Sequence, residues 1–164
     1  MTVPPALVGV DIAEVSRVAR AVADHGAHYA RHVMTPAERR LHGVGAAAVT
    51  ACVAMKECLI KAVGGRPPGF HWHDFDGVGG RLDASGPLPE LLDEAAQRLR
   101  AVSDLPLEHE VVHHVRGASG RAARSRLAPG DVAASPVIGV ARWGRRGDAV
   151  IALALLVIDD LGVR

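Results

Sequence analysis

The sequence predicts a single α+β domain. Two observations lead to this class: segments with a strand pattern occur beside segments of helical spacing, and the last two strand segments are joined by a short turn. The chain has 164 residues, enough for one ordinary hydrophobic core, and only 3% of them are aromatic, so the core should consist of Val, Leu, Ile and Ala. No internal repeat or second domain is recognisable, so residues 1–164 are expected to fold as one unit.

The first half of the chain predicts one strand followed by three helices. Apolar residues alternate along Leu7–Ile12, which is the pattern of a buried strand, and the spacing becomes helical over Glu14–Asp24. Thr35–Glu38 combines an N-cap threonine, a proline at the first helical position and a glutamate at the third, which predicts a capping box. The alanine-rich segment Ala46–Val63 predicts the longest helix, and Gly64 follows as its C-terminal signal.

The second half of the chain predicts mainly strands. After a turn at Arg66–Gly69, the expected strands are Phe70–Asp76, Arg81–Ala84, Leu107–Val115 and the hairpin of Val137–Trp143 with Ala149–Ile158. Pro89–Val102 has the spacing of an amphipathic helix. Residues 116–136 are rich in Gly, Ala, Ser and Arg, and we expect a mobile inserted loop there.

Charge and cysteine content limit the function classes. The formal net charge is +1, so no overall field attracts nucleic acid. Cys52 and Cys58 point about 120° apart on a helix, so they should neither form a disulfide nor bind one metal, and free thiols fit a reducing cytoplasm. No leader pattern and no apolar run of about 20 residues occurs, so we expect a cytoplasmic protein without a membrane segment.

Lysine is rare in this chain, and both lysines lie close together. Lys56 and Lys61 are the only two among the 19 Lys and Arg residues. An ammonium is a compact point charge on a flexible stem, which suits phosphate neutralisation or proton transfer better than a planar guanidinium does. Glu57 and Lys61 share one helix face, so a surface ion pair between them is the simpler alternative.

Three segments carry a family resemblance. Gly9–Val15 reads GVDIAEV, Val53–Gly64 reads VAMKECLIKAVG and Phe70–Asp76 reads FHWHDFD. In this order they resemble the holo-acyl-carrier-protein synthases, which are AcpS-type 4′-phosphopantetheinyl transferases, with the motifs G-[IV]-D-[IV]-x-E-[VI] and F-A-A-K-E-A-x-x-K-A-[FL]-G and a short following strand. Met34–Glu38 lies where that family has its L-T-x-x-E helix start, and the match covers roughly residues 7–102.

The resemblance implies a fold and an activity. The fold would be AcpS-like, with a curved antiparallel sheet packed against the long helix Ala46–Val63, assembled as a homotrimer with active sites between subunits. The activity would be transfer of 4′-phosphopantetheine from coenzyme A to a serine of an apo acyl carrier protein, with release of 3′,5′-ADP. Such carrier proteins serve fatty-acid or polyketide synthesis, and no membrane or nucleic acid is involved.

The resemblance also implies roles for residues. Asp11 and Glu57 would hold Mg²⁺, which usually binds one or two protein carboxylates together with substrate phosphates. The implied catalytic set is Asp11, Glu57 and Lys61, with Glu57 as acceptor of the serine proton. The residues implied to contact coenzyme A are Lys56, Lys61, Gly64, Arg66 and Arg142. An acidic carrier protein would suit a basic rim, for which the candidates are Arg17, Arg20, Arg39 and Arg40.

Two features depart from the family pattern. The family's S-[IL]-S-H strand is represented here by Ile138–Trp143, which has neither the serines nor the histidine, and the arginine before F-A-A-K-E is Cys52. One interpretation is a divergent transferase in which arginines replace the lost phosphate contacts, namely Arg142 or Arg121, Arg124 and Arg126. The other is a repurposed scaffold that acts on, or binds, an acyl chain tethered to a carrier protein.

Two functions outside the family have partial support in the sequence. His71 and His73 would share one face of a strand beside Asp74, which suggests a metal-dependent hydrolase. However, transition-metal sites need three or four convergent ligands, and no HExxH or comparable spacing occurs. The arginine-rich loop lacks the interleaved aromatic residues of a nucleic-acid surface. Three further histidines, His25, His28 and His32, have helical spacing and are better explained as a polar helix face.

Overall fold

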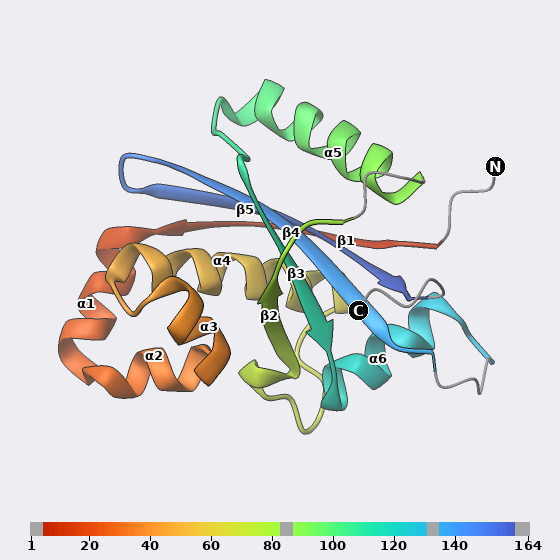
Figure 1. Ribbon diagram of the computed structural model, residues 1–164, viewed down its shortest axis with the longest axis horizontal. Helices are drawn as coiled ribbons and strands as arrows, with labels where there is room; N and C mark the ends of the chain where they lie inside the picture. Colours follow the sequence, from red (N-terminus) through yellow and green to blue (C-terminus); the bar gives the residue numbers. More distant parts are fainter. Residues whose placement is uncertain (1–4, 83–86, 131–134, 160–164) are drawn as a thin grey trace.

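A computed structural model describes residues 5–82, 87–130 and 135–159. Within these residues one antiparallel sheet of five strands has the order β1-β5-β4-β3-β2 (Figure 1). The strands are β1 (Leu7–Glu14), β2 (Phe75–Gly79), β3 (His109–Val115), β4 (Val137–Arg146) and β5 (Ala149–Ile158). The helices are α1 (Val15–His25), α2 (Ala27–Val33), α3 (Pro36–His42), α4 (Ala46–Val63), α5 (Pro87–Ser103) and α6 (Gly117–Leu127), with a 3₁₀ turn η1 (Trp72–Asp74).

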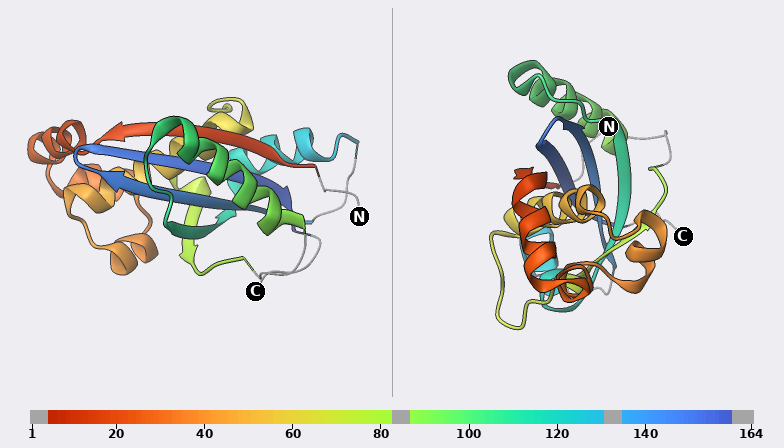
Figure 2. Two further views of the ribbon diagram at one scale, coloured as in Figure 1. Left: turned by 90° about the horizontal axis from the view of Figure 1, so that it is seen from above. Right: turned by 90° about the vertical axis from the view of Figure 1, so that its left-hand side faces the viewer.

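Helices cover the two faces of the sheet unequally. Figure 2 shows α5 on one side, and α4 with the short helices α1 to α3 on the other. The larger core cluster joins α4 to the inner residues of β4 and β5, and the smaller one joins α5 to Val140, Leu153 and Leu155. No helix among the described residues is long and apolar enough to cross a membrane.

Helix α4 is the central element, and β1 lies directly against it. A methyl group on Gly9 would stand 1.8 Å from the carbonyl oxygen of Cys58, so glycine is required for this approach. Strand alternation then places Asp11 on the same side of β1 as Gly9, facing α4. The close contact of β1 with α4 therefore brings the Asp11 carboxylate beside the last turns of α4.

Most of the locally encoded predictions are confirmed. The Ala46–Val63 helix has the predicted bounds, and Gly64 ends it in a left-handed conformation with φ of 98°. The capping box is present: the backbone N–H of Glu38 donates to the Thr35 hydroxyl, and that of Thr35 donates to the Glu38 carboxylate. The C-terminal hairpin and the amphipathic helix α5 also form where expected, each slightly longer than predicted.

The predicted strand Phe70–Asp76 is wrong in most of its length. Residues 72–74 form the 3₁₀ turn η1, because the His71 ring accepts from the backbone N–H of His73 and the Asp74 carboxylate accepts from the backbone N–H of His71. Strand β2 starts only at Phe75 and continues to Gly79, beyond the predicted end at Asp76. Its partner is the distant β3, and Arg81 and Leu82 have no strand structure. The other two residues of the predicted strand Arg81–Ala84, residues 83–84, lie outside the described residues.

The loop predicted at 116–136 is also wrong in part, because Gly117–Leu127 is the helix α6. The Asp74 carboxylate from η1 caps this helix by accepting hydrogen bonds from the backbone N–H and hydroxyl of Ser119, at 3.0 and 2.8 Å. Gly117 has φ of 58°, and a methyl group there would lie 2.2 Å from Asp74 Oδ1. Since the cap comes from a residue more than 40 positions earlier, no local signal marked this helix start. Residues 131–134 lie outside the described residues.

Candidate active site

A cavity of about 680 Å³ opens between β1, α1 and α4. Its charged lining residues are Asp11, Glu14, Arg17, Glu57 and Arg66, and its apolar wall includes Tyr29, Val53 and Trp72. Burial raises the pKa of Tyr29, so its hydroxyl stays protonated at neutral pH. The cavity thus combines two carboxylates predicted to hold a metal with a guanidinium and an aromatic wall.

Asp11 and Lys61 form the first ion pair of the site. Lys61 Nζ lies 2.7 Å from Asp11 Oδ1 and 3.2 Å from the carbonyl oxygen of Val10. The hydrogen bond to Asp11 raises the pKa of Lys61, so the ammonium remains charged across the physiological range. More than half of the Lys61 side chain is exposed, so the ammonium can reach a ligand in solution.

Glu57 and Arg66 form the second ion pair. Arg66 Nη2 donates to Glu57 Oε1 at 2.7 Å, and the guanidinium carbon lies 5.3 Å from the centre of the Phe70 ring and 5.0 Å from that of Trp72. Both rings therefore orient the guanidinium by cation–π contact. The simpler alternative, a Glu57–Lys61 surface pair, is wrong, because each residue contacts a different partner.

Lys56 lies elsewhere, although it is five residues from Lys61. Its side chain is 0% exposed, and Nζ contacts Glu38 Oε2 at 2.8 Å, with two backbone carbonyl oxygens completing its acceptors. The prediction that Lys56 contacts coenzyme A is therefore wrong, since no ligand in the cavity reaches a fully buried ammonium.

Arg142 also lies away from the cavity. It projects to the sheet face covered by α5, where it pairs with Glu110 at 2.9 Å and Asp93 at 2.5 Å. Asp11 faces α4 on the opposite side of the sheet. Within one chain Arg142 does not line this cavity, because β4 presents it to the other face of the sheet. Its contact with coenzyme A stays a prediction for a site formed between subunits.

The segment that replaces the family's S-[IL]-S-H strand packs against α4. A methyl group on Gly139 would lie 2.7 Å from a terminal carbon of Leu59, and Ala141 is fully buried. Neither position has room for a larger polar side chain without rearrangement. In a single chain this part of β4 serves packing.

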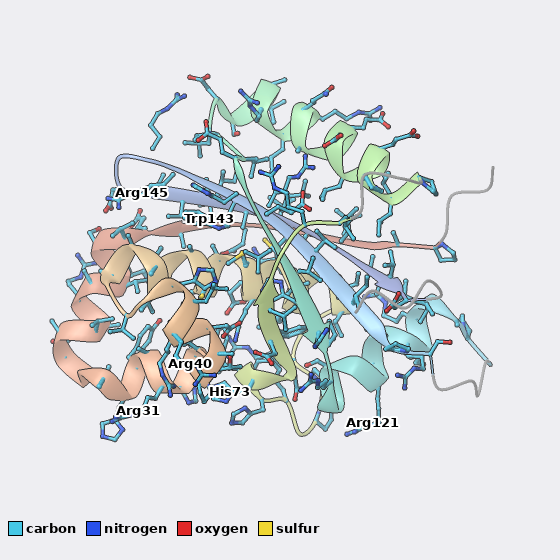
Figure 3. The ribbon with its side chains drawn as sticks, in the orientation of Figure 1. Arg31, Arg40, His73, Arg121, Trp143 and Arg145 are labelled. Carbon is cyan, nitrogen blue, oxygen red and sulfur yellow. The ribbon has the colours of Figure 1, made fainter. Side chains whose placement is uncertain are left out.

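The arginines of residues 116–136 now have defined places on α6. Arg126 reaches the C-terminal end of α4, where Nη1 donates to the carbonyl oxygen of Ala62 at 2.8 Å, directly beside Gly64. Arg124 contacts the carbonyl oxygen of Ser135, and Arg121 lies on the outer side of α6 (Figure 3). Arg126 is thus the arginine of this group nearest to the predicted contact Gly64.

The histidines do not assemble a metal site in the described part of the chain. His71 and His73 lie in and beside η1 with ring centres 4.8 Å apart, and His73 Nε2 is 3.0 Å from the carbonyl oxygen of Arg31, which Figure 3 labels nearby. Burial lowers the pKa of His73. Residues 5–82, 87–130 and 135–159 contain no group of three or more His, Cys, Asp or Glu able to hold a metal ion.

Two residues of functional interest were not singled out from the sequence. Trp72 forms part of the cavity wall, and its ring packs against the Arg66 guanidinium. Glu38 is the buried partner of Lys56. Trp72 belongs to the matched FHWHDFD segment, and Glu38 belongs to the capping box. Both positions lie within recognised motifs, but no local signal indicated that Trp72 would form the cavity wall or that Glu38 would pair with Lys56.

Comparison with known proteins identifies the family and similar folds. The sequence model of the 4′-phosphopantetheinyl transferase superfamily matches residues 7–112. A holo-[acyl-carrier-protein] synthase of Maridesulfovibrio salexigens is 30% identical over 108 residues, which cover 64% of this chain and 86% of that protein. The holo-ACP-synthase from Plasmodium yoelii superposes with a TM-score of 0.57 at 15% identity, covering 92% of this chain and 93% of that one. An ACPS–CoA complex from Chronobacterium ammoniagenes gives 0.52 at 20% identity, with 93% and 97% covered. These likenesses confirm the predicted AcpS-like fold.

Proposed function

Because this chain belongs to the 4′-phosphopantetheinyl transferase superfamily, we propose that it transfers 4′-phosphopantetheine from coenzyme A to a serine of an apo acyl carrier protein. The observation that carries this proposal is the charge arrangement of the cavity. Asp11, Glu57 and Arg66 line the same cavity, where Arg66 pairs with Glu57, and Lys61 pairs with Asp11. Phosphoryl transfer requires charge neutralisation and alignment more than covalent chemistry from the protein, and these four residues supply both.

The proposed reaction is a substitution at phosphorus. The serine oxygen of the carrier protein forms a bond to the phosphorus that bears the pantetheine arm, and the bond from that phosphorus to the bridging oxygen breaks. The leaving group is 3′,5′-ADP, and Glu57 accepts the serine proton directly or through water. Lys61 and Arg66 contact the diphosphate oxygens and so stabilise the negative charge that develops on the leaving group.

A magnesium ion fits the donor set. Mg²⁺ prefers oxygen ligands and usually binds one or two carboxylates together with substrate phosphates and water, so a third protein ligand is not needed. Asp11 and Glu57 are the two carboxylates that would hold it, and the bound ion would neutralise the diphosphate.

The carrier protein is proposed to dock on the helices α1 to α3. Five arginines lie on them, and none forms an ion pair with a carboxylate among the described residues; they are Arg17, Arg20, Arg31, Arg39 and Arg40. Figure 3 labels Arg31 and Arg40 on this part of the molecule. An uncompensated positive surface beside the cavity suits an acidic protein substrate.

A homotrimer with active sites between subunits is part of the same proposal. Val8, Val10 and Ile12 project from β1 on the face opposite Asp11, and their exposed fractions are 53%, 39% and 58%. An apolar row on a sheet edge suits burial against another subunit. Ile12 also lines the cavity, so a neighbouring subunit seated on this row would border the cavity. A cytoplasmic location stays a prediction from the free thiols Cys52 and Cys58, which are both buried.

The test is intact-protein mass spectrometry of an apo acyl carrier protein after incubation with this protein, coenzyme A and Mg²⁺. The expected result is a mass gain of one phosphopantetheine group that disappears without Mg²⁺ and with Asp11→Ala. No gain with several carrier proteins, given a folded wild-type protein, would refute the proposal.

A second candidate function has one observation in its favour. The strand that replaces S-[IL]-S-H is packed against α4 at Gly139, and its Arg142 is already paired with two carboxylates. This favours a repurposed scaffold that acts on, or binds, an acyl chain tethered to a carrier protein. The same mass assay with an acylated holo carrier protein detects a change of its acyl chain, and gel filtration of the mixture detects binding. Only the repurposed scaffold would give either result without coenzyme A.

A further inference from the structure

We propose that the buried pair Lys56–Glu38 positions the Glu57–Arg66 pair of the cavity, and that it acts through Trp72 in the turn η1. This inference rests on the proposed function for its catalytic consequence, but its structural part can be measured without activity. Neither Lys56 nor Glu38 touches the cavity, so both would be positioning residues.

The pair is completely buried and its hydrogen bonds are saturated. Lys56 Nζ donates to Val33 O at 2.7 Å, to Glu38 Oε2 at 2.8 Å and to Trp72 O at 3.2 Å, which uses all three ammonium protons. The Glu38 carboxylate accepts from Lys56 and from two backbone N–H groups, those of Thr35 at 2.8 Å and Gly77 at 2.7 Å. The two side chains thereby join α2, α3, α4, η1 and β2 at one point.

Stability alone gives little reason for such a pair. Removing two charges from water is costly, and a buried ion pair can often be replaced by apolar residues of similar volume without loss of stability. What an ion pair adds is direction, because each hydrogen bond fixes the group that it reaches. The group of functional interest here is the Trp72 carbonyl, since it belongs to the residue that forms the cavity wall.

A continuous series of contacts runs from Lys56 to Glu57. Lys56 donates a hydrogen bond to the Trp72 carbonyl, and the Trp72 ring contacts the Arg66 guanidinium at 5.0 Å. Arg66 in turn donates to Glu57 at 2.7 Å. Lys56 and Glu57 are neighbours in α4 whose side chains point about 100° apart, so one enters the core while the other enters the cavity. The adjacent residues Lys56 and Glu57 thus supply the group that positions Arg66 and the cavity carboxylate with which Arg66 pairs.

The other end of η1 is fixed by α6. The carbonyl oxygen of Asp74 accepts from the backbone N–H of Arg116 at 2.8 Å, and its carboxylate accepts from Ser119. Trp72 therefore lies in a short turn held at both ends by buried hydrogen bonds. A turn fixed in this way keeps Arg66 in one orientation beside Glu57.

The first experiment measures the position of Trp72 directly. The chain has two tryptophans, so Trp143→Phe leaves Trp72 as the single fluorescent reporter. Adding Lys56→Met should shift its emission to longer wavelength and increase its quenching by acrylamide, at a temperature where the protein is folded. Met55→Ala is the matched control: it also removes buried atoms from α4, but it faces a different cavity. Unchanged Trp72 emission and quenching in the Lys56→Met protein would overturn the proposal, whatever the activity.

The second experiment tests the path through Arg66 with a double-mutant cycle. Lys56→Met should lower kcat for carrier modification by about 100-fold, the order expected when a catalytic group is displaced by about 1 Å. In an Arg66→Met background the same change should cost less than about threefold, because the route to Glu57 is already broken. Equal losses in both backgrounds would overturn the proposal.

The third experiment separates positioning from stability. The double variant Lys56→Met/Glu38→Gln removes both charges, so the buried carboxylate is no longer left without its cation. Its amide oxygen keeps an acceptor for only one of the N–H groups of Thr35 and Gly77, because these bond to different oxygens of Glu38. We expect its melting temperature to rise toward that of the wild type, while kcat stays as low as in Lys56→Met, because no donor reaches Trp72. Recovery of kcat together with stability would assign the pair a purely structural role. If the wild-type protein transfers nothing, the proposed function fails, and the fluorescence measurement still decides the positioning of Trp72.

Discussion

Replacing Glu57 with glutamine removes one negative charge from the cavity and keeps the shape of the side chain. In the structure Glu57 makes one ion pair, with Arg66, and the two side chains are 26% and 51% exposed. Partly exposed ion pairs contribute only about 0.2–1 kcal/mol to stability. The amide oxygen can still accept a hydrogen bond from Arg66, so the free energy of unfolding should change by less than about 1 kcal/mol.

The expected effect on catalysis is much larger. An amide cannot accept the serine proton, and loss of a positioned general base typically lowers the rate by about 10²–10⁴-fold. At about 1.4 kcal/mol per factor of ten, this equals about 3–5 kcal/mol of activation free energy. The loss of activity should therefore exceed the loss of stability several-fold, which distinguishes a catalytic group from a structural one.

The assay combines initial rates of carrier modification, followed by intact-protein mass spectrometry, with urea unfolding of the same preparation. Glu94→Gln is the matched control, because Glu94 forms an exposed pair with Arg98 on α5, outside the cavity. This control should leave rate and stability unchanged. Turnover of Glu57→Gln within about twofold of the wild type, in the presence of Mg²⁺, would remove Glu57 from the mechanism.

Three further predictions concern the scaffold. Gly9→Ala should lower the melting temperature strongly and abolish transfer. The added methyl group would lie 1.8 Å from the carbonyl oxygen of Cys58 and would force β1, together with Asp11, away from α4. An unchanged melting temperature would contradict this packing. Burial lowers the pKa of His113 to about 3 from an ordinary 6.5, so the unfolded chain takes up this proton at a higher pH than the folded protein does. The free energy of unfolding should therefore fall as the pH drops below about 6.5, by at most about 1.4 kcal/mol per pH unit. Urea unfolding of His113→Leu should lack this part of the decline, and an identical pH profile would contradict it. Gly117→Ala should destabilise α6, because φ is 58° there and the methyl group meets the Asp74 carboxylate; circular dichroism melting tests this against Ala122→Gly, an ordinary helix-interior change of smaller cost.

The sequence alone determined those features whose signals are local. Thr35 and Glu38 form their capping box three residues apart, and α4 ends at Gly64 because glycine accepts the left-handed conformation. The resemblance to the family motifs also implied that Asp11, Glu57 and Lys61 act together; Asp11 and Glu57 line one cavity, and Lys61 pairs with Asp11. Each of these predictions depends on groups within a few residues of one another or on a spaced pattern.

The tertiary structure decided where identical residue types act. Lys56 and Lys61 have the same chemistry and lie in the same helix, yet one pairs with buried Glu38 and the other with Asp11 at the surface. The helix α6 likewise depends on a cap from Asp74, and β2 depends on pairing with β3. These outcomes are set by which distant segments the folded chain brings into contact. A sequence pattern specifies the groups that can pair, but only the packing of α3, β1 and η1 around α4 fixes the partner of each charge and so its role.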